Sequence, residues 1–411
     1  MLTRADLESL DTADLLAPHR EAFALPGGVI YLDGNSLGAL PRATPRRLAE
    51  VAEREWGHGL IRSWNQAGWI DLPTKVGDKI APLIGAGPGE VIVTDSTSVN
   101  LFKTLAGALR VAGGRRVVVT EAENFPTDLY MMQGLVEWLC GRHTLRVVDA
   151  EDIVAAVDGD TAVLALTHVN YRSGAMHDMA ALTRLCHERG ALALWDLSHS
   201  AGAMPLDVAG AGVDFAVGCG YKYLNGGPGA PAFAYVPRRH QDAFRQPLSG
   251  WLGHAAPFAF EGSYRPAPGI ARCLTGTPPI LSMAALEVGV DLLLACDLAE
   301  IRRKSMRLTD LFVQLVEERC GTHDLRLLSP RSARSRGSQV SLRHAAGYPI
   351  MQALIARGVI GDFRAPDILR FGLVPLYVRY ADVWDAVAAL TDVLDTRVWD
   401  RPEFHARAAV T

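Results

Sequence analysis

The sequence lacks any strong excess of charge. Its 411 residues carry 41 basic and 45 acidic side chains, for a formal net charge of −4. Such a balance creates no extended field that would attract a polyanion, so nucleic acid is not an expected partner. The composition, 49% apolar and 21% charged, is that of a globular chain and excludes extensive disorder, and the length allows two or three domains.

Long hydrophobic runs and paired cysteines are absent as well. No apolar stretch approaches the roughly 18 residues that a membrane-spanning helix needs. The first residues, MLTRADLESLDTADLL, are too polar for a secretory signal, so we expect a soluble cytoplasmic protein without membrane contacts. The six cysteines form no CxxC pair, which argues against a disulfide framework and against a zinc site, and no metal is expected.

Lysine is scarce, since only five of the 41 basic residues are lysines. Four of them (Lys75, Lys79, Lys103 and Lys304) lie in segments with the pattern of exposed helices. Lys222 instead falls between the apolar run DFAVG and the glycine-rich stretch NGGPG. A lysine partly withdrawn from water can form a Schiff base with a carbonyl compound, and the small residues around it favour close approach of a ligand. A surface-loop lysine is the alternative.

Short apolar runs alternate with helical segments through the middle of the chain. This alternation indicates a largely parallel sheet covered by helices. The runs predicted as strands are VIVTD, RRVVVT, TAVLALT, ALALWD, DFAVG and PAFAYV, and helices are predicted over residues 98–109 and 178–189.

One long helical stretch, over about 280–318, follows this region and leads into a segment typical of a smaller α+β domain. We therefore predict an N-terminal arm at 1–50, a large domain at 51–280, a linking helix at 281–320 and a small domain at 321–411. The arm could join either domain or cross to a partner subunit.

Four groups of reactive side chains follow predicted strands, where an open α/β sheet binds its ligands. They are Ser96 with Thr97, Phe125 with Asp128, Asp196 with His199, and Lys222 with Tyr221. Each group has a structural alternative, namely a helix cap, a core aromatic, a salt bridge or a surface loop. Together, however, they would bind the phosphate, ring face, ring nitrogen and aldehyde of pyridoxal phosphate.

The motifs YLDGNSLG, ENFPTD, WDLSHSAG and GCGYKYLNGGPG, followed by GWLGH and GTPPIL, resemble those of kynureninases in sequence and order. The resemblance covers nearly the whole chain. It implies an α/β fold of the fold-type-I class, related to class-V aminotransferases, with a large domain built on a mostly parallel sheet and a smaller α+β C-terminal domain. It also implies a homodimer with active sites at its interface, and pyridoxal phosphate-dependent hydrolysis of L-kynurenine to anthranilate and L-alanine in tryptophan catabolism.

The same resemblance implies a role for each matching residue. Lys222 would carry the cofactor, Asp196 would pair with its ring nitrogen, and Tyr221 would relay a proton. The other implied cofactor contacts are Ser96, Thr97, Phe125, Asp128, His199, Trp251 and Thr277, the last two acting across the dimer interface. The implied substrate contacts are Arg370 for the α-carboxylate, and Asn35, Ser36, His58, Trp64 and Gly276 around the aryl ring. Trp64 with Thr277 implies a preference for kynurenine over 3-hydroxykynurenine.

Other functions use parts of the same site. A cysteine desulfurase needs a nucleophilic cysteine on a loop, for which Cys273 is the candidate. An aminotransferase would also use Lys222 and Asp196, and a homologue that has lost catalysis would still bind the cofactor. A nicotinamide-dependent oxidoreductase is disfavoured because no GxGxxG motif opens a helix after a strand.

Overall fold

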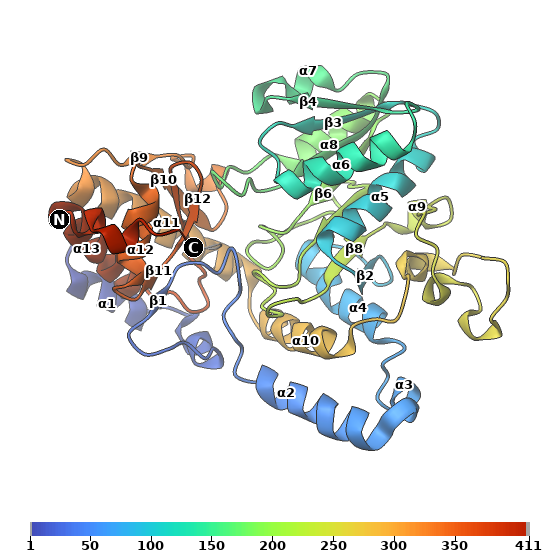
Figure 1. Ribbon diagram of the computed structural model, residues 1–411, viewed down its shortest axis with the longest axis horizontal. Helices are drawn as coiled ribbons and strands as arrows, with labels where there is room; N and C mark the ends of the chain where they lie inside the picture. The colour runs from blue at the N-terminus through green and yellow to red at the C-terminus, as the bar shows by residue number, and fades with distance from the viewer. Residues whose placement is uncertain (1, 408–411) are drawn as a thin grey trace. The chain divides into compact units, whose positions relative to one another are not determined.

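The structure, a computed structural model, describes residues 2–407. The chain divides into two compact units (Figure 1). The larger unit comprises Thr44–Asn170 and His177–Ala295, and the smaller comprises the residues up to Ala43, Tyr171–Met176 and the residues from Cys296 onward. This division differs from the predicted boundaries at 50, 280 and 320, because the N-terminal segment and a short segment from the middle of the chain both belong with the C-terminal residues.

A seven-stranded sheet forms the centre of the larger unit, with the strand order β2-β8-β7-β6-β5-β3-β4. All neighbouring strands are parallel except β8, which is antiparallel to β2 and β7. The strands are β2 (Val91–Thr94), β3 (Val117–Glu121), β4 (Thr144–Val148), β5 (Thr161–Thr167), β6 (Leu192–Asp196), β7 (Phe215–Gly218) and β8 (Ala232–Tyr235). The predicted mostly parallel α/β sheet is thus confirmed.

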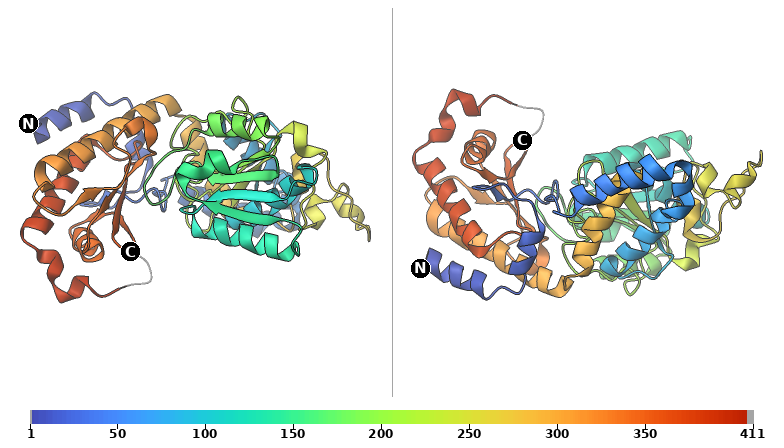
Figure 2. Two further views of the ribbon diagram at one scale, coloured as in Figure 1. Left: turned by 90° about the horizontal axis from the view of Figure 1, so that it is seen from above. Right: turned by 90° about the horizontal axis from the view of Figure 1, so that it is seen from below.

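Helices cover both faces of this sheet. Helices α5 (Thr97–Val111) and α6 (Pro126–Trp138) lie on one face and α8 (Met179–Glu188) lies on the other (Figure 2). Strand β5 is buried along its whole length, which explains why it is a continuous apolar run rather than an alternating pattern. The remaining helices are α2 (Thr44–Glu50), α3 (Ser63–Gln66), α4 (Leu72–Ile84), α7 (Ile153–Ala156), α9 (Arg238–Gln241) and α10 (Ile280–Leu294), and a π-helical segment covers Val51–Gly59.

The prediction of one continuous helix over 280–318 is wrong. Helix α10 ends at Leu294, and a second helix, α11 (Leu298–Cys320), begins after Asp297. The Asp297 carboxylate accepts a hydrogen bond from the Ala299 backbone N–H at 2.8 Å, which caps the new helix. The division between the two units falls in this break.

The smaller unit is an α+β structure, as predicted. Its antiparallel four-stranded sheet has the order β12-β13-β10-β9, and β1 pairs in parallel with β11. The strands are β1 (Ile30–Tyr31), β9 (Arg326–Leu327), β10 (Gln339–Arg343), β11 (Val359–Ile360), β12 (Asp362–Arg364) and β13 (Ile368–Gly372). Besides α11, its helices are α1 (Arg4–Thr12), α12 (Gly347–Ile355) and α13 (Tyr380–Asp395).

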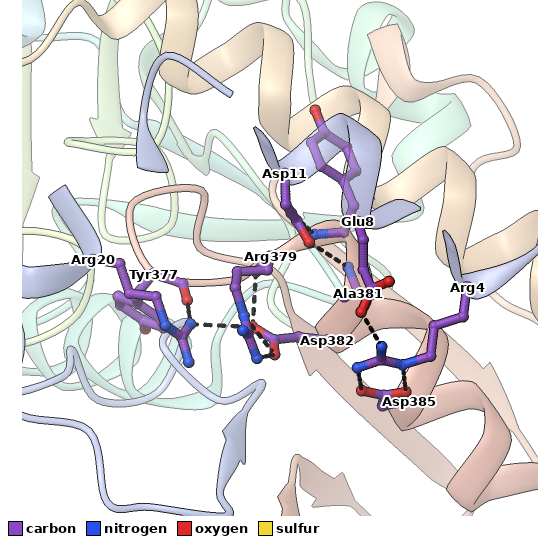
Figure 3. Close-up of polar contacts among 10 residues, drawn as sticks. Arg4, Glu8, Asp11, Arg20, Tyr377, Arg379, Ala381, Asp382 and Asp385 are labelled. Atoms are coloured by element: carbon purple, nitrogen blue, oxygen red, sulfur yellow. Dashed lines mark hydrogen bonds and ion pairs between the residues drawn. The ribbon is translucent and has the colours of Figure 1, made fainter. Parts of the chain in front are cut away.

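Polar contacts attach the N-terminal segment to helix α13 (Figure 3). The Asp11 carboxylate accepts the backbone N–H groups of Tyr380 and Ala381, at 2.7 and 3.0 Å, and Arg4 forks onto Asp385. The first N–H groups of a helix have no partner within it, so Asp11 supplies acceptors that α13 lacks. The N-terminal segment is therefore an integral part of the smaller unit.

None of the helices within residues 2–407 combines the length and the apolar character that a bilayer crossing requires.

Candidate active site

The loop after β7 places Lys222 near the carboxyl ends of the central strands of the larger unit. Its half-buried Nζ lies 2.9 Å from His199 Nε2. The same atom lies 5.9 Å from the centroid of the Phe125 ring and 5.7 Å from that of Tyr221. The structure therefore brings together four residues that belong to three separate motifs in the sequence.

Two buried carboxyl groups, those of Asp128 and Asp196, interact with this lysine. Burial raises the pKa of Asp128 well above its ordinary value, and the neighbouring Asp196 raises this pKa further. Burial also raises the pKa of Asp196, against the effects of a 2.7 Å hydrogen bond from the Ser198 backbone N–H and of the Lys222 charge. Paired acids in such a site favour a cationic group placed against them.

The strand-to-helix turn after β2 contains Ser96 and Thr97. Ser96 is the N-cap of α5, and its hydroxyl accepts the Val99 backbone N–H at 3.4 Å. The structural alternative, a helix cap, is thus realised. Ser96 is nevertheless exposed and Thr97 half-exposed, so the hydroxyls and the free N–H groups at the start of a 15-residue helix are accessible to an anion.

The prediction that the other four lysines lie on exposed helix surfaces is wrong for two of them. Lys103 is 1% exposed and Lys304 is 5% exposed. The ammonium of Lys103 lies 2.5 Å from Asp95, and that of Lys304 lies 2.7 Å from Asp14. Helical periodicity does not reveal that these lysines are buried. The carboxylate that neutralises each of them lies outside the helix that contains the lysine. Lys222 differs from both, because its nitrogen contacts an imidazole and lies near two ring faces.

Trp251 begins a short 3-10 helix of the larger unit, Gly276 and Thr277 lie on a loop, and all three are exposed. Trp251 packs edge-on against Phe258, with ring centroids 5.7 Å apart. His58 is exposed near the end of the π-helical segment, and the half-buried Trp64 packs edge-on against Trp69 at 5.9 Å. The roles of these five residues in binding cofactor or substrate stay predictions.

Arg370, the predicted carboxylate-binding residue, lies on β13 of the smaller unit and is buried. Its Nε and Nη2 fork onto Asp362, at 3.2 and 2.6 Å. Nη1 donates to the Tyr171 carbonyl at 2.6 Å, and Nη2 also donates to the Ser36 hydroxyl at 2.9 Å. Asn35 is buried and donates to Gln339 at 3.3 Å. The structure thus brings Ser36 to Arg370 and joins Asn35 to β10, the neighbouring strand of the same sheet.

Sequence reasoning missed Asp362. Its segment, GDFRAPDILRFG, forms the hairpin of β12 and β13, in which Asp362 and Arg370 are directly opposite. An acidic and a basic residue on either side of a turn, placed to face each other across a hairpin, was the signal that could have indicated this pair. With 36 arginines among the 41 basic residues, spacing alone does not identify that pair.

Within residues 2–407, no group of three or more histidine, cysteine, aspartate or glutamate side chains is arranged to hold a metal ion.

The site combines the Lys222 amine, the Phe125 ring and two buried acids near the strand ends of a mostly parallel sheet. This combination defines a fold-type-I enzyme that uses pyridoxal phosphate. Two solved structures share the fold. The cysteine desulfurase from Thermococcus onnurineus NA1 has a TM-score of 0.78 at 19% identity, covering 92% of this chain and 98% of that one. A C-DES variant with glycine linked to its PLP cofactor also has a TM-score of 0.78, at 16% identity, covering 91% and 99%.

Sequence comparison identifies the family. The model of the kynureninase C-terminal domain matches residues 301–390. The kynureninase of Burkholderia pseudomallei (strain 1106a) is 59% identical over the full length of both chains. The chain belongs to the kynureninase family.

Proposed function

We propose that this chain hydrolyses L-kynurenine to anthranilate and L-alanine, with pyridoxal phosphate as cofactor. The observation that carries the proposal is the Lys222 amine, which lies near an imidazole, two aromatic rings and a pair of buried acids in a chain of the kynureninase family. The residues fit the cofactor because each of its recognisable groups has a complementary side chain in the larger unit.

When bound, pyridoxal phosphate supplies an aldehyde that captures an amine and a protonated ring that withdraws electrons. Asp196 would hold the proton on the ring nitrogen, with Asp128 beside it, and Phe125 would cover a ring face. Ser96, Thr97 and the first N–H groups of α5 would bind the phosphate. His199 would orient the Lys222 amine, to which it is hydrogen-bonded.

The amine of Lys222 is the proposed base that removes the α proton of the substrate. Water must add to the aryl ketone before the bond between the β and γ carbons breaks and anthranilate leaves. Tyr221 is half-buried next to Lys222 and would carry a proton to the carbonyl oxygen or to the alanine fragment.

A desulfurase activity is disfavoured by the state of its candidate nucleophile. Cys273 is 1% exposed, and burial raises the pKa of its thiol to about 11. A nucleophilic cysteine must form a thiolate at neutral pH, so this side chain is unsuited to the role. An aminotransferase and an inactive homologue would retain Lys222 and Asp196, and only a product assay separates them from a hydrolase.

That assay follows anthranilate fluorescence after L-kynurenine is added to purified protein loaded with pyridoxal phosphate. We expect anthranilate and L-alanine in equal amounts, and slower release of 3-hydroxyanthranilate from 3-hydroxykynurenine. The preference is what the family resemblance implies for a site with Trp64 and Thr277. Transfer of the amino group to a keto acid would instead indicate an aminotransferase, and the absence of any product would indicate a homologue that only binds the cofactor.

We further propose a homodimer whose active sites lie at its interface, in the cytoplasm. Large apolar side chains are exposed on two segments of the larger unit, including Ile61 at 76% and Phe260 at 78%. Exposed apolar side chains of this size favour burial against a second copy of the chain. The segments adjoin Trp64 and Trp251, which the family resemblance places at the active site.

The dimer predicts that Ile61→Asp combined with Phe260→Asp converts the protein to monomers in sedimentation analysis. Burial of two carboxylates in an apolar interface opposes association strongly. The matched control is Leu15→Asp, which places the same charge on an apolar residue that is 70% exposed in the smaller unit. A wild-type protein that sediments as a monomer would refute the proposed dimer.

A further inference from the structure

Lys103 lies on the buried side of α5, where its ammonium contacts two polar groups of the larger unit. Its Nζ lies 2.5 Å from Asp95 Oδ2 and 2.6 Å from the backbone carbonyl of Cys273. The charge of a lysine that is 1% exposed requires a partner, because an unpaired buried ammonium is strongly destabilising. Asp95 and the Cys273 carbonyl are therefore held at fixed positions relative to α5.

Asp95 directly precedes Ser96 and Thr97, the proposed phosphate contacts. Its φ is +46°, a left-handed backbone conformation that is costly for a residue other than glycine. Such a conformation persists where surrounding contacts fix it. Two groups contact the Asp95 carboxylate, namely the Lys103 ammonium and the Thr94 hydroxyl, which donates to it at 2.8 Å. The Asp95 backbone carbonyl accepts the Ala232 N–H, also at 2.8 Å.

The same carboxylate also contacts the loop that carries Gly276 and Thr277. The Thr275 hydroxyl donates to Asp95 Oδ1 at 3.3 Å. The Thr275 carbonyl accepts the Leu252 N–H at 3.2 Å. Gly250 packs so closely here that a Cβ on it would lie 2.3 Å from the same carbonyl oxygen. The segments that carry Trp251 and Thr277 are thus tied to each other and, through Asp95, to the turn that carries Ser96.

We propose that Lys103 and Asp95 form a positioning pair that couples cofactor binding in the two subunits of the dimer. The pair fixes the 95–97 turn, which would hold the phosphate of the subunit's own cofactor, relative to the 275–277 loop, which would reach the partner's cofactor. This inference rests on the proposed cofactor site and on the proposed dimer.

The first test is Lys103→Met, which keeps the unbranched apolar stem of the side chain and removes its charged end. Pyridoxal phosphate is titrated into the apoprotein and followed by absorbance, and the melting temperature of the apoprotein is measured in parallel. We expect Kd for the cofactor to rise at least about tenfold, because the 95–97 turn loses the charge that holds Asp95 in place. The matched control is Lys304→Met, which removes the other buried, paired lysine and lies in the smaller unit.

The two variants separate positioning from general stability. Both should lower the melting temperature, but only Lys103→Met should raise Kd. An equal rise of Kd in both variants, or an unchanged Kd in Lys103→Met, would overturn the proposal. If Lys103→Met does not fold, Thr275→Val removes only the hydroxyl that joins the loop to Asp95, and it should still raise Kd without changing the melting temperature.

Coupling between subunits is tested with mixed dimers purified through two affinity tags. A wild-type subunit is paired with one that carries both Lys103→Met and Lys222→Ala, so the only site with Lys222 has an intact turn but an altered partner loop. The reference is wild type paired with Lys222→Ala alone. We expect half-maximal activity to require about fivefold more cofactor than in the reference. An equal requirement would overturn the coupling, whereas a failure to recover any mixed dimer would refute the proposed dimer itself.

Discussion

Replacing Lys222 with alanine should lower kcat for L-kynurenine by at least about 10³-fold, because the variant loses both the group that bonds to the cofactor and the proposed base. The protein should also lose the bond to pyridoxal phosphate that borohydride reduces. The readout is mass spectrometry of the borohydride-treated protein beside the anthranilate assay. Cofactor should still bind non-covalently, since Asp196, Phe125 and the turn after β2 are unchanged.

The matched control is Lys75→Ala. Lys75 is also a lysine of the larger unit, but its side chain is 59% exposed, and its partner Glu287 keeps a second ion pair with Lys79. Removing such an ion pair changes stability little. Retention of a reducible bond in Lys222→Ala, or its loss in Lys75→Ala, would show that another lysine carries the cofactor. The buried Lys103 and Lys304 would then be the next residues to replace.

The fold was predictable where burial is complete. Strands β2, β3, β5 and β7 are buried along their length and stand out as apolar runs. Strand β4 is at the sheet edge and mostly exposed or half-buried, and α6 has only three buried residues, so neither has a strong apolar pattern. The break between α10 and α11 depends on one capping side chain, Asp297, in an otherwise helical pattern.

The site was predictable to the extent that its chemistry lies next to strand ends. Lys222, Asp196 and His199 could be singled out in this way, and in the structure Lys222 Nζ lies 2.9 Å from His199 Nε2. Asp362 and Lys103 could not, because their importance depends on partners from other segments, Arg370 and Asp95. Resemblance to the family, rather than spacing, selected Arg370 among 36 arginines.

Replacing Arg370 with lysine should lower kcat/KM for L-kynurenine by about 10²-fold, mainly through a higher KM. Lysine keeps the charge against Asp362, but it cannot offer two parallel N–H groups to a carboxylate. Steady-state kinetics measure the change, and an analogue without the α-carboxylate serves as a competitive inhibitor. Its inhibition constant should be the same for wild type and variant, since it never uses the guanidinium.

The contacts of Arg370 determine which N–H groups of its guanidinium can bind the substrate carboxylate. Nε and Nη2 are engaged by Asp362, so a carboxylate must bind the Nη1 and Nη2 edge and replace the contacts to Tyr171 and Ser36. Arg364→Ala is the matched control, because Arg364 pairs with Asp362 at 2.8 Å without belonging to the proposed clamp. A rise of KM in Arg364→Ala as large as in Arg370→Lys would show that disturbing the ion pairs of Asp362 is enough to produce the effect, and Arg370 would then have no direct role in binding the carboxylate.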